Sequence, residues 1–260
     1  MLFAIDIGNT NIVCGLFQGA EILTVWRISS DTRRSADEHW ALLRSLSAAD
    51  GLDLPGQVHA AIIGSVSPVL TTALAEMCQR RLRCPPIIAH VGLDLGLEVR
   101  VKEPGRVGID RLLNAVAAQA RLGAPCIALD LGTATKFDVV DAGGAFIGGA
   151  IAPGLLTAAE ALTRGAALLP RIELTPPPSP IGHDTTTAMQ SGILLGYVGL
   201  IEGLLARIQA ALPALPGQPP APVIATGGLA GLILPHTDRI PHHDPALTLH
   251  GLRIVHERNR

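Results

Sequence analysis

Hydrophobic residues near the start of the chain gather in short runs separated by turn residues, a pattern typical of β-strands. We expect strands there over residues 2–5, 12–17 and 21–28. From about Ser35 onward, apolar positions recur at helical spacing and alternate with further short apolar runs. We expect helices over 35–49, 68–82 and 108–122, and strands over 60–64 and 87–90. Strands that alternate with helices after an antiparallel start predict an α/β domain with a mixed sheet.

The second part of the chain repeats this order of strands and helices. We expect strands near 126–131, 135–141, 145–152 and 223–226, and helices over about 154–163, 185–212 and 247–256. The repeat predicts two related halves, an N-terminal domain over residues 1–116 and a C-terminal domain over residues 117–260. Domains of about 100–150 residues lie in the usual size range.

Composition and charge narrow the class of protein. The chain has 260 residues, 48% of them hydrophobic, so it can bury a substantial core. Its net charge of −2 gives no electrostatic footprint for binding nucleic acid or an anionic membrane. The longest uncharged apolar stretch, Gly192 to Ile201, is interpreted as a buried helix, because a membrane span needs about 20 residues. Four cysteines stand apart without a CxxC pair, which is typical of reduced thiols. We therefore expect a cytoplasmic protein without nucleic-acid or membrane partners.

One short phrase occurs twice in the chain. Asp6-Ile7-Gly8-Asn9-Thr10-Asn11 and Asp130-Leu131-Gly132-Thr133-Ala134-Thr135 each follow an apolar run and precede another, which predicts strand, tight turn and strand. Hydroxyl and free N–H groups in such turns can bind phosphate oxygens, and an aspartate beside them can hold a divalent cation. One copy alone is equally compatible with a structural turn. Two matched copies, with Thr226-Gly227-Gly228 near the end, indicate two hairpins that bind one polyphosphate.

These three phrases together resemble the superfamily of acetate and sugar kinases, Hsp70 and actin. The resemblance implies a duplicated ribonuclease H-like (actin-like ATPase) α/β fold, with two mixed-sheet domains and a cleft between them. It also implies that the two hairpins bind the phosphates of ATP and that the turn at Gly227 and Gly228 faces the adenosine.

The segment from Pro104 to Ala115 narrows the resemblance to one family. Its phrase Gly108-Ile109-Asp110-Arg111 resembles type III pantothenate kinases, and the likeness spans nearly the whole chain. Further matching phrases follow in order, at Trp26-Arg27, Asp37-Glu38, 65–68, 148–154, 181–185 and 189–192. The resemblance implies an enzyme that uses ATP to phosphorylate pantothenate to 4′-phosphopantothenate, the first step of coenzyme A biosynthesis. It further implies a homodimer with the substrate pocket near the subunit interface.

Asp110 is the candidate catalytic base. Phosphorylation of a primary alcohol needs a base close to the hydroxyl, and an aspartate serves this role in other kinases. A carboxylate at a helix start is also favoured by the helix dipole whatever the function. By resemblance the pantothenate contacts are Gly108, Ile109, Asp110, Arg111 and Thr185. Thr185 has an alternative structural role as a residue that satisfies backbone N–H groups at a helix start.

The resemblance also assigns the nucleotide and metal contacts. It implies that the phosphates lie against the first repeated phrase and the two residues after it, namely Asp6, Ile7, Gly8, Asn9, Thr10, Asn11, Ile12 and Val13. Asp6 is the expected Mg²⁺ partner, and Thr10 and Asn11 are expected to donate to phosphate oxygens. In the second phrase, Asp130 is expected to bind a monovalent cation, K⁺ or NH₄⁺, and Thr133 to contact ATP.

Two positions depart from the family pattern. Val101 stands where many members carry a substrate-contacting tyrosine, so that contact is missing or is replaced, with Arg100 as a candidate. The only tyrosine is Tyr197. Lys136 stands where a threonine is common, and it either assists nucleotide binding or points to solvent.

Two other functions compete with this interpretation. One is a sugar or acetate kinase of the same superfamily, against which the phrase from Gly108 to Arg111 argues. The other is a non-catalytic regulator that keeps the fold, against which the three retained aspartates argue. The histidines His236, His242 and His243 lie among prolines, and we interpret that stretch as a solvated loop rather than a metal site.

Overall fold

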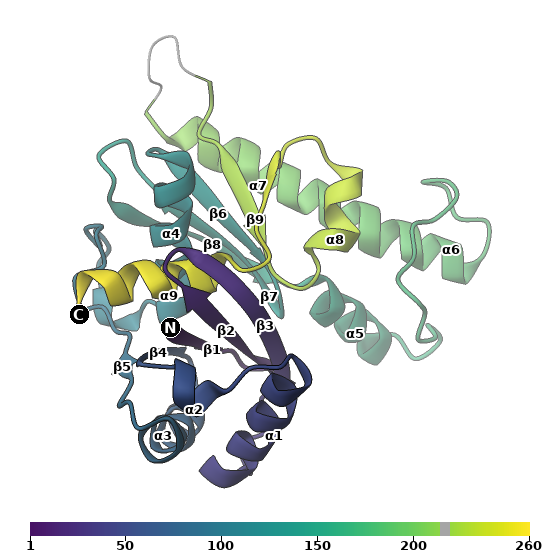
Figure 1. Cartoon of the computed structure of the whole chain (residues 1–260). Helices are drawn as coiled ribbons and strands as arrows, with labels where there is room; N and C mark the ends of the chain where they lie inside the picture. Colours follow the sequence, from purple (N-terminus) through teal and green to yellow (C-terminus); the bar gives the residue numbers. More distant parts are fainter. Residues whose placement is uncertain (214–218) are drawn as a thin grey trace. The chain divides into compact units, whose positions relative to one another are not determined.

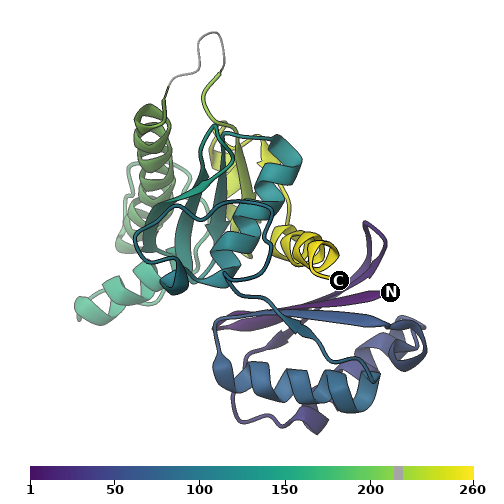
Figure 2. The ribbon, with the colours of Figure 1, turned by 90° about the vertical axis from the view of Figure 1, so that its left-hand side faces the viewer.

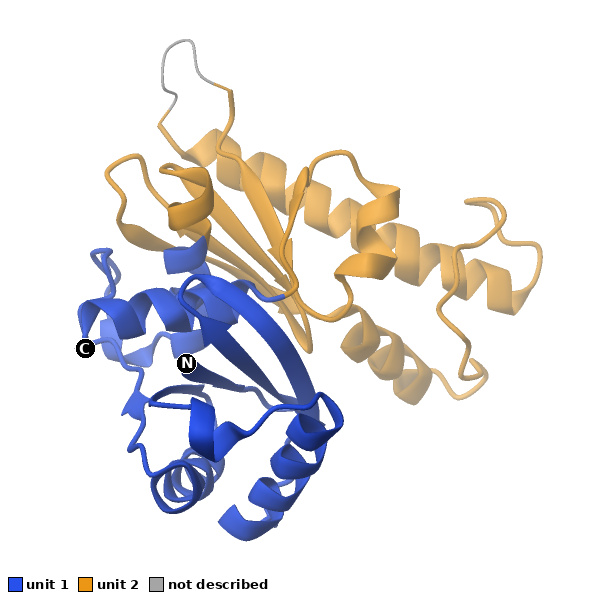
Figure 3. Ribbon diagram, in the orientation of Figure 1, with its two compact units in different colours: residues 1–117, 246–260 blue, residues 118–245 orange. Residues whose placement is uncertain are grey.

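The computed structural model describes residues 1–213 and 219–260. They divide into two compact units, unit 1 over residues 1–117 and 246–260 and unit 2 over residues 118–245 (Figure 3). This division differs from the two sequence-based halves in one element, because the last helix packs in unit 1.

Unit 1 is built on a mixed sheet of five strands in the order β3-β2-β1-β4-β5 (Figure 1). The strands are β1 (Leu2–Ile7), β2 (Asn11–Gln18), β3 (Glu21–Ser29), β4 (Ala60–Ser65) and β5 (Ile87–Ile88). β1 pairs antiparallel with β2 and parallel with β4. The edge strand β5 is shorter than the predicted strand over residues 87–90, because only residues 87 and 88 pair with β4.

Helices cover both faces of the unit 1 sheet. They are α1 (Ala36–Ala49), α2 (Leu54–Gln57), α3 (Pro68–Met77), η1 (Cys78–Leu82), η2 (Pro104–Arg106), α4 (Ile109–Leu122) and α9 (Leu247–Arg258). Figure 2 shows α3 and α9 on opposite faces of the sheet. Alternate side chains of β1 point to opposite faces of this sheet. Phe3, Ile5 and Ile7 belong to the core beneath α1 and α3. Their neighbours, Asp6 among them, point to the side of α9, because successive side chains of a strand face opposite ways.

Helix α9 packs directly on the sheet of unit 1, and glycines make this close contact possible. A Cβ on Gly15 would lie 2.9 Å from the side chain of Leu249, and one on Gly64 would lie 3.1 Å from that of Leu252. A Cβ on Gly251 would lie 2.2 Å from the backbone oxygen of Leu113 in α4. The end of the chain therefore completes the first unit rather than the second, which sequence periodicity alone cannot show.

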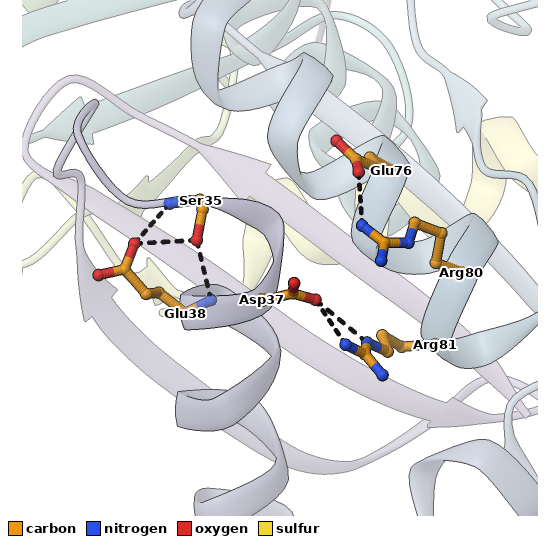
Figure 4. Close-up of polar contacts among 6 residues, drawn as sticks. All are labelled: Ser35, Asp37, Glu38, Glu76, Arg80 and Arg81. Carbon is orange, nitrogen blue, oxygen red and sulfur yellow. Dashed lines mark hydrogen bonds and ion pairs between the residues drawn. The ribbon is translucent and has the colours of Figure 1, made fainter.

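Helix α1 begins where its sequence predicts, at a capping box (Figure 4). The backbone N–H of Glu38 donates to Ser35 Oγ at 3.3 Å, and the N–H of Ser35 donates to the Glu38 carboxylate at 2.7 Å. In the first turn of α1, Asp37 accepts a hydrogen bond from Arg81 of η1 at 2.6 Å. This ion pair joins two elements of unit 1 at its surface, where such a contact adds little to stability.

Unit 2 repeats the sheet of unit 1 with the order β8-β7-β6-β9-β10. Its strands are β6 (Cys126–Leu131), β7 (Ala134–Val140), β8 (Phe146–Pro153), β9 (Val223–Thr226) and β10 (His242–His243). β6 pairs antiparallel with β7 and parallel with β9. The stretch around His242, predicted as a loop, supplies a short edge strand that is the counterpart of β5. The two matching sheets confirm the predicted duplicated α/β fold.

One long helical segment covers a face of the unit 2 sheet. The helices of this unit are α5 (Leu155–Gly165), α6 (Thr185–Gln190), η3 (Ser191–Leu195), α7 (Gly196–Ala211), α8 (Ala230–Ile233) and η4 (Leu234–His236). Tyr197, Ile201 and Leu205 of α7 lie in the core beneath β6 and β9. The segment Thr185–Ala211 is long and apolar enough to cross a membrane by length and composition, and 33% of an 18-residue apolar window within it is buried. Because one side packs in this core, we interpret it as a helix of unit 2 whose other side is exposed.

Candidate active site

The first hairpin consists of β1, the turn at residues 8–10 and β2. The N–H of Gly8 donates to the carbonyl of Asn11 at 3.0 Å and closes the turn. Ser30, directly after β3, stabilises this turn through two hydrogen bonds. The Ser30 hydroxyl donates to the Gly8 carbonyl at 2.7 Å, and the Ser30 N–H donates to the Thr10 carbonyl at 3.0 Å. The side chains of Asn9 and Thr10 are exposed at the tip. The turn is therefore held in shape while its tip remains open to a ligand.

Asp110 lies in the first turn of α4, next to a glycine that makes room for it. A Cβ on Gly108 would lie 2.5 Å from Asp110 Oδ1, so the carboxylate folds back over this residue. The N–H of Arg111 donates to the Gly108 carbonyl at 3.1 Å. Ile109 is buried, whereas Asp110 and Arg111 are partly exposed. The helix start thus carries one partly exposed carboxylate and one partly exposed guanidinium, at the helix end whose dipole favours anions.

Contacts within unit 1 connect Asp110 with Asp6. Gly64 of β4 stands opposite Asp6 in the parallel pairing of β1 and β4. A Cβ on Gly64 would lie 2.8 Å from the side chain of Leu113, which is one helical turn after Asp110. The sheet face that carries Asp6 is therefore the face on which the start of α4 packs. The structure brings the first hairpin and the candidate base to the same side of this unit.

The second hairpin consists of β6, the turn at Gly132 and Thr133, and β7. The N–H of Gly132 donates to the Ala134 carbonyl at 3.2 Å. The Thr133 carbonyl accepts from the N–H of Gly154 at 3.2 Å and from the Thr157 hydroxyl at 2.8 Å, while the Thr133 side chain is exposed. Backbone interactions and the Thr157 hydroxyl therefore fix this turn, with the Thr133 side chain at its exposed tip. The predictions from the sequence included neither Thr157 nor Ser30 of the first hairpin.

Asp130, the last residue but one of β6, forms an ion pair inside the hairpin. Its Oδ2 lies 2.7 Å from Lys136 Nζ, and the two side chains are 16% and 18% exposed. Lys136 is its direct partner in the β6–β7 pairing. The sequence left the orientation of Lys136 open, and the structure directs its ammonium group to this carboxylate rather than freely into solvent.

The turn at Gly227 and Gly228 follows β9 and packs on Asp130. Gly227 has a φ of +96°, and a Cβ there would lie 2.5 Å from the Leu131 carbonyl oxygen and 2.7 Å from Asp130 Oδ1. Gly228 has no atom within 4 Å of the corresponding position. Residue 227 therefore requires glycine both for its left-handed backbone and for lack of space.

Thr185 lies at the start of α6. The cap of this helix is Asp184, whose carboxylate accepts the N–H of Thr187 at 2.8 Å, so the alternative role considered for Thr185 belongs to its neighbour. These hydrogen bonds from Thr187 lower the pKa of Asp184. Thr185 is exposed and lines a mainly apolar cavity of about 700 Å³ with Pro153, Leu162, Met189, Tyr197 and Leu200, among others.

The remaining candidates of the sequence analysis carry no evident chemistry. Arg100, considered as a replacement for the missing tyrosine, pairs with Glu98 at 2.7 Å. The four cysteines are free and buried, and burial raises the pKa of Cys78 and Cys126 to about 12, so neither offers a thiolate at neutral pH. Within residues 1–213 and 219–260 there is no group of three or more His, Cys, Asp or Glu side chains that could hold a metal ion.

Solved structures similar to this chain share its fold at low sequence identity. A conserved putative Baf family transcriptional activator from Campylobacter jejuni matches with a TM-score of 0.58 and 14% identity, over 98% of this chain and 97% of its own. A putative 2-dehydro-3-deoxygalactonokinase from Sinorhizobium meliloti matches with a TM-score of 0.53 and 13% identity, over 98% of both chains. At these identities the likeness establishes the fold alone.

Sequence comparison identifies the family. The family model of type III pantothenate kinase matches residues 2–207. Proteins named type III pantothenate kinase are similar to this chain from end to end. That of Moorella thermoacetica is 46% identical over 100% of both chains, and that of Rhodospirillum centenum is 48% identical over 100% of this chain and 99% of its own. That of Thermomicrobium roseum is 49% identical over 99% of this chain and 97% of its own. This chain therefore belongs to the type III pantothenate kinase family.

Proposed function

We propose that this chain transfers the γ-phosphoryl group of ATP to the primary hydroxyl of pantothenate, giving 4′-phosphopantothenate and ADP in coenzyme A biosynthesis. The observation that carries the proposal is the 46–49% identity with type III pantothenate kinases over essentially the whole chain. The sugar and acetate kinase alternative is supported by likeness of fold, such as that to the Sinorhizobium meliloti protein at 13% identity. The regulator alternative is supported by the fold likeness to the Campylobacter jejuni protein at 14% identity, and likeness of fold does not imply likeness of function.

In this proposal Asp110 is the general base. As the pantothenate oxygen bonds to the γ-phosphorus, the bond from that phosphorus to the bridging oxygen breaks and ADP leaves. The hydroxyl proton passes to the Asp110 carboxylate, which returns it to solvent. Partial exposure of Asp110 and the small size of Gly108 support this role, because both leave the carboxylate accessible. Arg111 would bind polar atoms of pantothenate, and Gly108, Ile109 and Thr185 would line its site.

The first hairpin would bind the phosphates of ATP. Its tip presents the side chains of Asn9 and Thr10, and Asn11 follows at the start of β2. Asp6 fits a Mg²⁺ role, because Mg²⁺ in kinase sites is held by one or two carboxylates together with substrate phosphates. When bound, Mg²⁺ would neutralise charge on the phosphate oxygens. The fixed turn would orient those oxygens without rearrangement on binding.

The second hairpin would also contact the phosphates of ATP, and the glycine turn would contact the adenosine. Thr133 offers an exposed hydroxyl at a rigid turn, and Gly227 and Gly228 would let the adenosine approach the backbone. Asp130 is the position for which K⁺ or NH₄⁺ is expected. Its partner Lys136 already brings a positive charge to that carboxylate.

We also propose that the enzyme is a cytoplasmic homodimer. Unit 2 exposes several large apolar side chains, with exposed fractions of 63% at Ile151, 52% at Leu156, 95% at Leu168 and 72% at Ile181. Together with the exposed side of the Thr185–Ala211 segment, these residues offer an apolar surface that a second copy could cover. Sedimentation should give twice the chain mass, and Leu156→Glu should shift it toward the monomer. A monomer of the unaltered chain would contradict this part of the proposal.

A substrate panel tests the function. ADP release from ATP and Mg²⁺ is measured with pantothenate, glucose, N-acetylmannosamine, acetate or no acceptor. We expect release only with pantothenate. Release with a sugar or acetate instead would favour the other kinases, and nucleotide binding without any acceptor-dependent release would favour the regulator.

A further inference from the structure

The ammonium group of Lys136 lies at the carboxylate where the family resemblance implies a monovalent cation. Lys136 Nζ is 2.7 Å from Asp130 Oδ2, and both side chains are largely buried. The pairing of β6 with β7 places the two residues directly opposite each other. Side chains at such positions are held close together by the strand backbones. The ion pair is therefore part of the hairpin rather than a contact between long, mobile surface groups.

The second carboxylate oxygen of Asp130 is enclosed by the neighbouring glycine turns. A Cβ on Gly227 would lie 2.7 Å from Oδ1, and a Cβ on Gly132 would lie 3.4 Å from it. A monovalent ion at Asp130 would have to share the carboxylate with a full positive charge already in contact with it. Like charges at such distances repel, and more strongly where solvent is partly excluded. The residues present therefore do not fit K⁺ or NH₄⁺ at Asp130.

The first hairpin has the same strand pairing but a different residue across from its aspartate. The residue opposite Asp6 in the β1–β2 pairing is Val13, which carries no charge. The chain has 20 Lys and Arg residues, and only two of them, Lys102 and Lys136, are lysine. A lysine opposite Asp130 is therefore a specific choice. A lysine ammonium is a compact charge with three N–H donors, chemically close to NH₄⁺, whereas a guanidinium is planar and extended.

We propose that the Lys136 ammonium takes the place of the monovalent cation, so that this enzyme phosphorylates pantothenate without K⁺ or NH₄⁺. This inference rests on the proposed function, because the activity that tests it is the phosphorylation of pantothenate. A charge fixed beside the second hairpin would favour the ATP phosphates without exchange with the solution. Charges held in place before the reaction stabilise developing charge without reorganisation.

The unaltered enzyme provides the first test. Pantothenate-dependent ADP release is measured in KCl, NH₄Cl, NaCl and choline chloride at equal ionic strength, after removal of K⁺ and NH₄⁺ from all reagents. We expect rates within about twofold of one another, because no step needs an added ion. A rate that falls about tenfold or more in both NaCl and choline chloride would overturn the proposal.

The variant Lys136→Thr provides the second test, since it removes the built-in charge and frees Asp130. We expect turnover in choline chloride to fall by about tenfold or more, and KCl or NH₄Cl to restore most of it. Arg80→Thr is the control, because it deletes a basic residue from an exposed ion pair with Glu76 in unit 1. It should show no dependence on K⁺. A Lys136→Thr enzyme that is fully active in choline chloride, or that stays inactive in KCl, would overturn the proposal.

Melting temperatures separate this proposal from the proposed function. They are measured with ATP and Mg²⁺ in the same salts. The unaltered protein should melt at the same temperature in KCl and choline chloride, whereas Lys136→Thr should be stabilised selectively by K⁺ or NH₄⁺. If neither protein turns over pantothenate in any salt, the proposed function fails, and the melting temperatures still decide this inference. Selective stabilisation of the unaltered protein by K⁺ would overturn it.

Discussion

The hydroxyl oxygens of Thr135 and Tyr197 lie 2.6 Å apart in the interior of unit 2. Thr135 ends the second repeated phrase, and its hydroxyl also donates to the Pro153 carbonyl at 3.0 Å. Burial raises the pKa of Tyr197, with Asp130 contributing in the same direction. The only tyrosine of the chain thus ties α7 to the base of the second hairpin.

Removal of this tyrosine hydroxyl should destabilise unit 2 modestly. Tyr197→Phe should lower the free energy of unfolding by about 1 kcal/mol, because Thr135 keeps its bond to Pro153. Thr135→Val should cost about 2 kcal/mol, since it leaves both the tyrosine hydroxyl and the Pro153 carbonyl without this partner. Urea unfolding monitored by circular dichroism measures both values. Equal stability of all three proteins would show that the bond contributes nothing.

Gly227 should not tolerate a side chain. Gly227→Ala places a Cβ against the Leu131 carbonyl and Asp130 at a positive φ, so we expect a loss of about 2 kcal/mol or more in stability, together with weaker ATP binding. Gly228→Ala is a matched control for stability, because its Cβ meets no atom within 4 Å, and it should change the unfolding free energy by less than about 0.5 kcal/mol. Thermal melts and ATP titrations compare the two. Similar losses of stability in both variants would refute the claim that residue 227 has no space for a side chain.

His39 should make the protein less stable at acidic pH. The side chain is fully buried in α1, both ring nitrogens lack a hydrogen-bond partner, and burial, followed by Arg34, lowers its pKa, while Glu38 and Asp31 oppose the shift. A lowered folded-state pKa means that the unfolded chain binds the proton first. The contribution of His39 to the free energy of unfolding is therefore complete above the pKa of the unfolded chain, about 6.5, and is lost as the pH falls below it.

The variant His39→Leu tests this dependence. Between pH 7 and pH 5, it should reduce the slope of unfolding free energy against pH by up to about 1.4 kcal/mol per pH unit. His59→Leu, at an exposed position, should leave the slope unchanged. A slope for His39→Leu equal to that of the unaltered protein would mean that other groups cause the acid sensitivity.

Asp110→Asn should abolish most turnover while leaving the fold intact. The amide keeps the size of the side chain but cannot accept the hydroxyl proton, so we expect kcat to fall by about 10²–10⁴-fold. The melting temperature and ATP affinity should stay close to those of the unaltered enzyme, because Asp110 is partly exposed and is not assigned to the nucleotide. Near-normal turnover with pantothenate would refute its role as base.

The repeated strand-turn-strand phrases could be predicted from the sequence because their pattern is local. Apolar runs around Asp6 and Asp130 fix the strands, and the glycines fix the turns. The capping box at Ser35 is local in the same way. These features need no knowledge of distant residues, and the structure has each of them.

Long-range packing could not be predicted in this way. The position of α9 in unit 1 depends on glycines at 15, 64 and 251 that admit close contact, and nothing in the spacing of its own residues reveals this. The orientation of Lys136 depends on strand register, which a sequence pattern leaves open by one or two residues. The two-residue strand at His242 forms only because β9 offers a free edge.

The most direct test of the central claim is the identity of the product. The purified enzyme is incubated with ATP, Mg²⁺ and pantothenate, and the mixture is analysed by mass spectrometry and ³¹P NMR. We predict a pantothenate species heavier by one phosphoryl group, with its phosphorus coupled to the protons of the primary carbinol, formed in step with ADP. ADP formed without phosphorylated pantothenate, or phosphate attached at the secondary hydroxyl, would contradict the account.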